Sequence, residues 1–298
     1  MTDGPLIGAV TAPDLHVMTY NIRRRIPHVR RGNPDRWPTR KWLLELVLRA
    51  EQPTLLAVQE ALADQVDFLS QALGPHYRRL GNGRNANGRG ERTLLFYDSR
   101  RLELIDWRQR ALSATPDVPG SRSWGNFVPR VVVSAQFRDV ATQSRLFAFA
   151  THFDHISRKA RLESARMIRA LAAADHAADP DATIVVMGDV NADVTSPVYR
   201  ELTADGVLRD TWEAGAERLT PQWGTFSNYR RRRVGGKRID LILVGPGVQV
   251  LRTGINAVRF DGAAASDHEP VQAVVRAARS PDLRPPLAAS SKKAAANP

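Results

Sequence analysis

The sequence has 298 residues, 43% of them hydrophobic and 25% charged, which is the composition of a globular protein with a sizeable core. It contains no cysteine, so disulfides, zinc–thiolate sites, iron–sulfur clusters and cysteine nucleophiles are excluded. The formal net charge of +12 favours polyanionic ligands, either nucleic acid or a phosphate ester, unless it reflects only an arginine-rich composition.

No apolar run approaches the roughly 18 residues that a membrane-spanning helix needs. Residues 1–11 contain no basic segment followed by an apolar one, so we expect no secretory signal. We therefore expect a cytoplasmic protein without a membrane span, and we expect it to be a monomer.

Hydrophobic periodicity predicts the elements of the chain. The first half is predicted to contain helices over 39–50 and 64–73 and strands over 15–20, 54–59, 93–97, 102–107, 130–137 and 145–150. The second half is predicted to contain a helix over 157–174, N-capped by Ser157, and strands over 183–187, 239–244, 248–252 and 271–276. We expect 102–107 to pair with 93–97, and 130–137 to pair with 145–150 across a polar turn.

Many of these strands are consecutive and hairpin-like, and each half of the chain carries helices. This order favours an α+β fold, with two mixed sheets packed face to face and helices outside, over a doubly wound parallel sheet. No GxGxxG or Walker A motif supports a dinucleotide or P-loop site. We expect an N-terminal extension over 1–14, one domain over 15–278 and a disordered tail over 279–298, rich in Pro, Ala, Ser and Lys.

Short polar clusters that contain carboxylates, amides and histidines stand at the ends of strand-like segments. They are Tyr20-Asn21, Gln59-Glu60, Thr151-His152-Phe153-Asp154, Gly188-Asp189-Val190-Asn191, Arg238-Ile239-Asp240 and Ser266-Asp267-His268. Such clusters suggest one catalytic rim assembled from distant parts of the chain. Oxygen-rich ligands with few histidines suit a hard cation such as Mg²⁺ or Mn²⁺.

Asp189 and Asn191 follow an apolar strand and a Gly188 turn, and alternation along an extended segment places them on one face. A carboxylate that accepts a proton from water, beside an amide that fixes the direction of that water, can activate a nucleophile. The same pair is also typical of an Asx-turn after a strand.

Neighbouring side chains on an extended segment point in opposite directions, so we expect Asp267 to face a metal rather than to pair with His268. The carboxylate that orients His268 should then come from elsewhere, and Asp240 is the candidate. A surface turn is the other interpretation of this Ser-Asp-His stretch.

Glu60 ends an apolar strand, where a carboxylate is costly unless a partner such as a metal compensates it. Asn21 ends the first strand and can ligate a metal through its amide oxygen or hold a phosphate. His152 and Asp154 share a face, and His152 is a candidate donor to phosphoryl oxygens, with His155 nearby. A strand-end histidine bonded to the backbone is the alternative.

Two basic runs adjoin these clusters. Arg23-Arg24-Arg25 follows Asn21, and Arg230 to Arg233 with Lys237 and Arg238 precede Asp240. Each run is either a solvated face or a cradle for a phosphorylated ligand.

In their order along the chain, these clusters resemble the motifs of the endonuclease/exonuclease/phosphatase superfamily, which has the deoxyribonuclease-I-like fold. The matching elements lie at 18–21, 59–60, 151–152, 188–192, 238–240 and 266–268. The resemblance implies a four-layer α/β/β/α sandwich with its site at one edge of the two sheets. It also implies metal-assisted hydrolysis of a phosphate ester within the 15–278 domain.

The resemblance further implies a role for each matching residue. Glu60 would be the principal Mg²⁺ ligand, with Asn21 and Asp267 near the metal or a water on it. Asp189 would activate the attacking water, and Asn191 would orient it.

The histidines receive roles from the same resemblance. His152 would stabilise the phosphoryl oxygens or assist the leaving group, whereas His268 would contact the scissile phosphate and be oriented by Asp240. A bacterial subgroup of hydrolases with a His-Phe-Asp-His stretch and a Gly-rich loop ending in Glu is similar in detail. That similarity adds Asp154 and Glu91 to the candidate substrate-binding residues.

Arg23, His155 and Arg238 complete the candidate substrate-binding residues. Arg23 stands where the abasic-site endonucleases carry an acidic metal-site residue, so repair of abasic sites is less expected. We predict a Mg²⁺- or Mn²⁺-dependent phosphoesterase, with a phosphodiesterase or nuclease acting on DNA or RNA placed first. A phosphatase acting on phosphorylated sugars, inositides or lipid headgroups is the alternative, and an inactive nucleic-acid-binding module is the non-enzymatic one.

Overall fold

The computed structural model describes residues 4–28, 30 and 32–277, so the tail expected over 279–298 lies outside the described residues. Its helices are α1 (Trp37–Glu51), α2 (Ala63–Leu73), α3 (Arg158–Ala178), α4 (Pro197–Leu202), the 3₁₀ turn η1 (Ala204–Gly206) and α5 (Thr211–Ala214). Its strands are β1 (Leu15–Asn21), β2 (Leu55–Ala61), β3 (Tyr77–Leu80), β4 (Arg92–Asp98), β5 (Leu102–Ala111), β6 (Val131–Asp139), β7 (Arg145–His152), β8 (Thr183–Asp189), β9 (Arg209–Asp210), β10 (Glu217–Arg218), β11 (Asp240–Val244), β12 (Gln249–Ile255) and β13 (Val271–Arg276).

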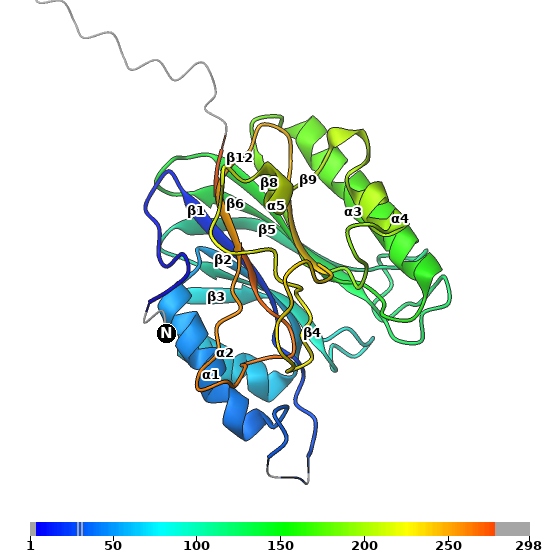
Figure 1. Ribbon diagram of the computed structural model, residues 1–298. Coiled ribbons are helices and arrows are strands. Elements are labelled where there is room, and N and C mark those ends of the chain that lie inside the picture. Colours follow the sequence, from blue (N-terminus) through cyan, green and yellow to red (C-terminus); the bar gives the residue numbers. More distant parts are fainter. Residues whose placement is uncertain (1–3, 29, 31, 278–298) are drawn as a thin grey trace, which may run out of the picture.

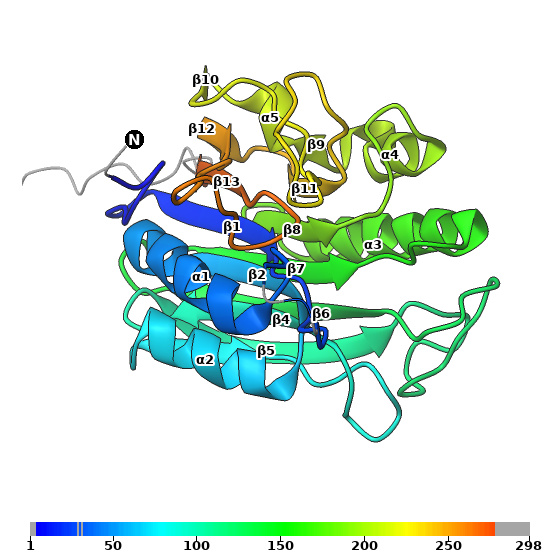
Figure 2. The same ribbon diagram turned by 60° about the horizontal axis from the view of Figure 1, so that its bottom comes forward.

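The strands form two mixed sheets that pack face to face (Figures 1 and 2). A seven-stranded sheet has the order β10-β12-β13-β1-β2-β4-β3, and a six-stranded sheet has the order β5-β6-β7-β8-β11-β9. Helices α1 and α2 cover the outer face of the first sheet, and α3 and α4 cover the outer face of the second (Figure 2). The chain is therefore a four-layer α/β/β/α sandwich, which confirms the predicted fold class.

Apolar layers on both sides explain the sequence of the central strands. In β1, which is buried along its whole length, Val17 faces the core between the sheets and Met18 faces the helices. A strand covered on both faces needs no polar alternation, so β2 contains the apolar run 55–58 and β8 contains the apolar run 184–187. Helix α1 buries Leu44, Val47 and Leu48, which are spaced three and four residues apart on one face.

One predicted strand pairing is wrong. Strand β5 pairs with β6 in the second sheet, whereas β4 pairs with β2 and β3. Because β3, which the periodicity did not predict, occupies the remaining edge of β4, the chain crosses to the other sheet after β4. The β6–β7 pairing is confirmed, and so is the cap of α3, where the Ser157 hydroxyl accepts the Ala160 N–H at 3.1 Å.

Strand directions bring distant polar residues to one edge of the sandwich. Strands β1 and β2 run parallel, as do β7 and β8, so their carboxyl ends meet. Strand β11 runs antiparallel to β8 and begins beside the end of that strand. The register pairs Asn21 with Gln59, His152 with Asp189, and Asp240 with Asp189. Among the helices that the structure describes, none is both long and apolar enough to cross a membrane.

Candidate active site

The carboxylate of Asp189 lies at the centre of the polar cluster formed by these strand ends. Its Oδ2 accepts a hydrogen bond from Asn21 Nδ2 at 3.0 Å and lies 3.6 Å from His152 Nε2 and 3.8 Å from His268 Nε2. Asp189 is 1% exposed. Burial, reinforced by repulsion from Asp240, raises the pKa of Asp189 to about 7.

The structure brings His268 and Asp240 into direct contact. His268 Nδ1 and Asp240 Oδ2 are 2.9 Å apart, although the two residues come from different segments of the chain. Burial would lower the pKa of His268, but the carboxylates of Asp240 and Asp189 outweigh it and raise the pKa to about 10. Asp240 therefore fixes the orientation of the ring and favours its charged form.

Simple alternation predicted that Asn191 shares a strand face with Asp189, and this prediction is wrong. Strand β8 ends at Asp189, and Asn191 has a left-handed φ of 48°. The Asn191 backbone N–H donates to Asp189 Oδ1 at 2.8 Å, which is the Asx-turn interpretation, and its Nδ2 donates to the Phe153 carbonyl at 3.1 Å. The turn uses Oδ1 of Asp189, and Oδ2 remains available to accept the hydrogen bond from Asn21, so one carboxylate serves both the turn and the cluster.

A bulge in β2 aims Glu60 into the cluster. The register with β4 shifts between Val58 and Ala61, and Glu60 has a φ of 66°, which turns its side chain out of the normal alternation. Glu60 Oε1 accepts from Asn21 Nδ2 at 3.0 Å, and Oε2 accepts the Arg24 N–H at 3.1 Å. Burial would raise the pKa of Glu60, but these hydrogen bonds hold it below its usual value.

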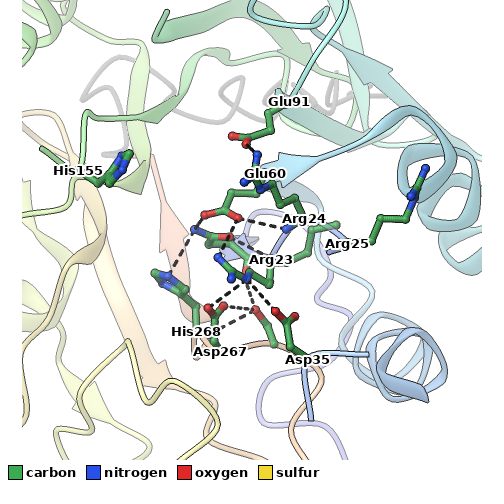
Figure 3. A network of polar contacts seen from close by, with 12 residues as sticks. Arg23, Arg24, Arg25, Asp35, Glu60, Glu91, His155, Asp267 and His268 are labelled. Atoms are coloured by element: carbon green, nitrogen blue, oxygen red, sulfur yellow. Dashed lines mark hydrogen bonds and ion pairs between the residues drawn. The ribbon is translucent and has the colours of Figure 1, made fainter. Parts of the chain in front are cut away.

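Arg23 lies among three carboxylates (Figure 3). Its guanidinium is 3.2 Å from Asp35, 3.5 Å from Asp267 and 3.9 Å from Glu60. Burial raises the pKa of Asp267, although His268 and Arg23 oppose this effect. Asp35, which the sequence analysis did not select, also accepts a hydrogen bond from the Tyr229 hydroxyl at 2.8 Å.

The other predicted substrate-binding residues divide between the rim of the cluster and elsewhere. Glu91 lies on the rim, 2.9 Å from Arg24 and 2.6 Å from Arg84. Arg238 lies away from it, because its guanidinium is held at 2.8 Å by Asp210 and at 2.9 Å by Glu213. Within the described residues, the ion pairs of Arg238 are therefore those with Asp210 and Glu213.

Asp154 and His155 both lie against Arg130, which the sequence analysis missed. The Asp154 carboxylate accepts the backbone N–H groups of Ile156 and Ser157 and lies 3.7 Å from Arg130 Nε. His155 Nδ1 is 2.9 Å from Arg130 Nη2. The only sequence signal for Arg130 was its position at the start of a predicted strand, which does not distinguish it from a solvated arginine.

The chemistry of these residues fits a divalent cation. Ligand-type atoms of Asp189, Asp240 and His268 lie within 4.8 Å of one another, and the carboxylates of Glu60 and Asp267 are nearby. Asp240 Oδ1 is buried and has no hydrogen-bond partner among the described residues. Several buried carboxylates that repel one another are stabilised by a hard cation with oxygen preference. Glu60 and Asp267 would hold it, with Asn21 linking Glu60 to Asp189.

The fold and the site together define a class of phosphate-ester hydrolases with the deoxyribonuclease-I-like sandwich, whose members are generally dependent on divalent metals. The chain belongs to the endonuclease/exonuclease/phosphatase family, whose sequence profile matches residues 18–268. It is therefore a hydrolase of phosphate-ester bonds. A comparison with curated protein sequences found no significant match.

Solved structures agree with this assignment. The endonuclease/exonuclease/phosphatase from Bacteroides vulgatus is 29% identical with a TM-score of 0.80, and the alignment covers 89% of this chain and 99% of that one. The mannosyl-6-phosphatase of Bacteroides thetaiotaomicron is 29% identical with a TM-score of 0.79, over 88% of this chain and 99% of that one. The catalytic domain of human Nocturnin shares the fold at 17% identity and a TM-score of 0.68, over 89% of this chain and 95% of that one.

Proposed function

We propose that the protein is a Mg²⁺- or Mn²⁺-dependent phosphoesterase in which Asp189 activates the attacking water. The observation that carries this proposal is the position of the Asp189 carboxylate. It shares the Asn21 amide with Glu60 and lies between His152 and the His268–Asp240 pair. A pKa of about 7 suits a general base, because the group is both ionised and basic near neutral pH.

The hydrolytic step assigns one task to each of these side chains. The water oxygen bonds to phosphorus while one of its protons passes to Asp189, and the ester P–O bond breaks to release an alkoxide that takes a proton from solvent water. His268, charged because its pKa is raised to about 10, donates to a phosphoryl oxygen as negative charge develops. When bound, the divalent cation polarises the phosphoryl group and stabilises the in-line displacement.

His152 has a different electrostatic role. Burial, together with Arg130 and Arg84, lowers the pKa of His152 well below its usual value. A neutral imidazole cannot carry charge to the phosphate, but its N–H can donate a hydrogen bond to it. We therefore assign His152 to positioning of the phosphoryl group.

A phosphomonoester is the substrate class we place first, on the similarity to the mannosyl-6-phosphatase at 29% identity. Phosphodiester cleavage, which the sequence analysis placed first, is the second candidate. It is favoured by the exposed Arg230–Arg233 run and by Phe226, which is 48% exposed with its ring 4.9 Å from that of His268. An exposed aromatic ring beside a basic loop suits a stacked base.

The test is a hydrolysis panel with Mg²⁺ or Mn²⁺ against EDTA. It contains p-nitrophenyl phosphate, bis-p-nitrophenyl phosphate, sugar phosphates, inositol phosphates, DNA and RNA. We expect metal-dependent turnover that Asp189→Asn abolishes and that the surface control Asp205→Asn, whose carboxylate is 76% exposed, retains. Turnover that persists in EDTA, or in Asp189→Asn, would contradict the proposal.

A further inference from the structure

A small cavity opens beside His152 and Glu60. Thr93 and Val131 line it together with six titratable residues, which are Glu60, Arg84, Glu91, Arg92, Arg130 and His152. None of the roles proposed above places a substrate group against the arginines of this cavity. Three arginines around one small space, next to the predicted reaction centre, need either carboxylates or a ligand anion to balance them.

Arg130 brings buried, unbonded donors to the lining of this cavity. Its side chain is 4% exposed, and its Nε and Nη1 have no hydrogen-bond partner among the described residues. The ion pair with Asp154 is 3.7 Å long, which is outside hydrogen-bond range, and Asp154 Oδ2 is unbonded as well. An ion pair that served only to stabilise the fold would satisfy these donors. Since Nε and Nη1 of Arg130 are buried and unbonded, they point to a ligand that is not part of the chain.

Arg84 is held at the cavity by its loop. The Arg84 N–H donates to the Glu91 carbonyl at 3.0 Å, so residues 84–91 fold back and bring both side chains to the rim. Burial lowers the pKa of Arg84, Glu91 opposes this, and Arg130 adds to it. Arg84 and Arg130 thus repel each other, and Glu91 is shared with Arg24.

The size of the cavity limits what can enter it. Its volume is about 10 Å³ for the centres of water-sized spheres, which is room for one oxygen-sized atom and not for a sugar or a base. A terminal phosphate has three non-bridging oxygens, whereas a phosphodiester has only two. In the proposed reaction, one non-bridging oxygen would point to the divalent cation and a second to His268. A phosphodiester has no further charged oxygen, whereas a terminal phosphate has a third one for Arg84 and Arg130.

We propose that Arg84 and Arg130 form a subsite for the third oxygen of a terminal phosphate, and that this subsite selects phosphomonoesters over phosphodiesters. The inference rests on the proposed function, because it assigns the substrate class of the same site. Arginine is suited to this task, since its planar donors pair with two phosphate oxygens or hold one from two sides.

The test compares three variants with the wild type in the presence of Mg²⁺. Arg84→Gln removes one guanidinium, and Arg130→Lys keeps the charge opposite Asp154 but loses the planar donors, which limits damage to the fold. Arg79→Gln is the matched control, because this exposed arginine lies on the edge strand β3 and pairs with Asp67 and Ser70 of helix α2. Circular dichroism and thermal melts verify that each variant is folded.

Two measurements are made on each variant. Calorimetric titration with inorganic phosphate should show a dissociation constant at least tenfold higher in Arg84→Gln and Arg130→Lys, and within twofold of the wild type in Arg79→Gln. The kcat/KM for p-nitrophenyl phosphate should fall at least tenfold more than the kcat/KM for bis-p-nitrophenyl phosphate.

The outcomes separate the subsite from the reaction. Phosphate binding that is unchanged in both cavity variants, or equal losses for the two esters, would overturn the subsite. If the wild type hydrolyses no phosphate ester of the full panel, the proposed function fails, whereas the phosphate titration still decides whether Arg84 and Arg130 bind the anion.

Discussion

Buried carboxylates at two places in the sandwich differ in how far hydrogen bonds satisfy them. Glu51, at the end of α1, is 1% exposed and receives four hydrogen bonds. The donors are the backbone N–H groups of Leu6, Ile7 and Gly8 and the amide of Asn256, at 2.7 to 3.1 Å. This carboxylate is fully used in attaching the N-terminal segment to the domain.

The carboxylates of Asp189, Asp240 and Asp267 at the strand ends are not satisfied in this way. Asp240 Oδ1 has no partner among the described residues, and Asp189 is buried beside Asp240 so that its pKa is raised. Asp267 also has a raised pKa, first because it is buried. The comparison teaches that a buried carboxylate bonded by neutral donors stabilises a fold, whereas a cluster left with surplus negative charge is built for a ligand that carries positive charge.

The largest expected effect follows from removing the central carboxylate of the site. Asp189→Asn should lower kcat/KM by about 1,000-fold or more, because it removes the proton acceptor and leaves the rest of the site in place. The measurement is steady-state hydrolysis of the best substrate with saturating Mn²⁺. A loss of less than about tenfold would mean that Asp189 is not the base.

The matched change at Glu51 should lower stability and leave hydrolysis intact, which is the opposite of what we expect for Asp189→Asn. Glu51→Gln replaces an acceptor of three backbone N–H groups by a side chain that is itself partly a donor, so stability should fall by about 3 kcal/mol. Urea unfolding measures the loss, and kcat of the folded variant should stay within twofold of the wild type. Glu45→Gln on the same helix, whose partner is Arg49, should cost no more than about 0.5 kcal/mol.

The stability of the fold around Glu51 and the N-terminal segment should also depend on pH, through His16. Burial lowers the pKa of His16 from 6.5 to about 4, while Nδ1 bonds to the Gly8 carbonyl at 2.8 Å. Since the unfolded chain binds a proton below pH 6.5 and the folded chain does not until about pH 4, stability should fall as the pH drops through this window.

We expect about 2 kcal/mol of this loss to disappear in His16→Gln, which can still donate to Gly8. The measurement is urea unfolding of both proteins at several pH values between 4 and 7. Parallel curves for the two proteins would show that His16 is not the group responsible.

The smallest expected effect concerns the stability of the metal-free protein. Here removal of a buried carboxylate should stabilise the fold, whereas removal of Glu51 should destabilise it. The raised pKa of Asp189 means that the metal-free fold is favoured while this group is protonated, and that this contribution is lost as the pH rises through about 7. At pH 8 without metal, Asp189→Asn should therefore be more stable than the wild type by about 1 kcal/mol. Thermal melts in EDTA test this, and a destabilised variant would contradict the account of surplus charge.

Much of this arrangement could be predicted from the sequence. Apolar strands that end in polar residues, such as β1 with Asn21 and β8 with Asp189, indicate both the sheet and its functional edge. The contact between His268 and Asp240 followed from period-two geometry, which left His268 without a neighbouring partner in the sequence. Periodicity reports which face is buried and not which strand is next to it, so the pairing of β5 could not be derived in this way.

Residues outside regular backbone escaped prediction for a related reason. Alternation cannot give the direction of Glu60 or Asn191, because both have positive φ values. Arg84 and Arg130 carry no local pattern that separates them from the many solvated arginines, and their meaning depends on burial. Arg238 adjoins a site motif in sequence, yet Asp210 and Glu213 hold its guanidinium elsewhere.

The central claim is that the surplus negative charge at the strand ends is retained to bind the divalent cation that hydrolysis requires. The most direct measurement is one Mn²⁺ titration that follows metal binding and hydrolysis in the same samples of wild type, Glu60→Gln and Glu51→Gln. The account predicts that binding and hydrolysis rise together in the wild type and in Glu51→Gln, and that both need at least tenfold more Mn²⁺ in Glu60→Gln. Hydrolysis that proceeds fully in EDTA, or Mn²⁺ binding that is unchanged in Glu60→Gln, would contradict it.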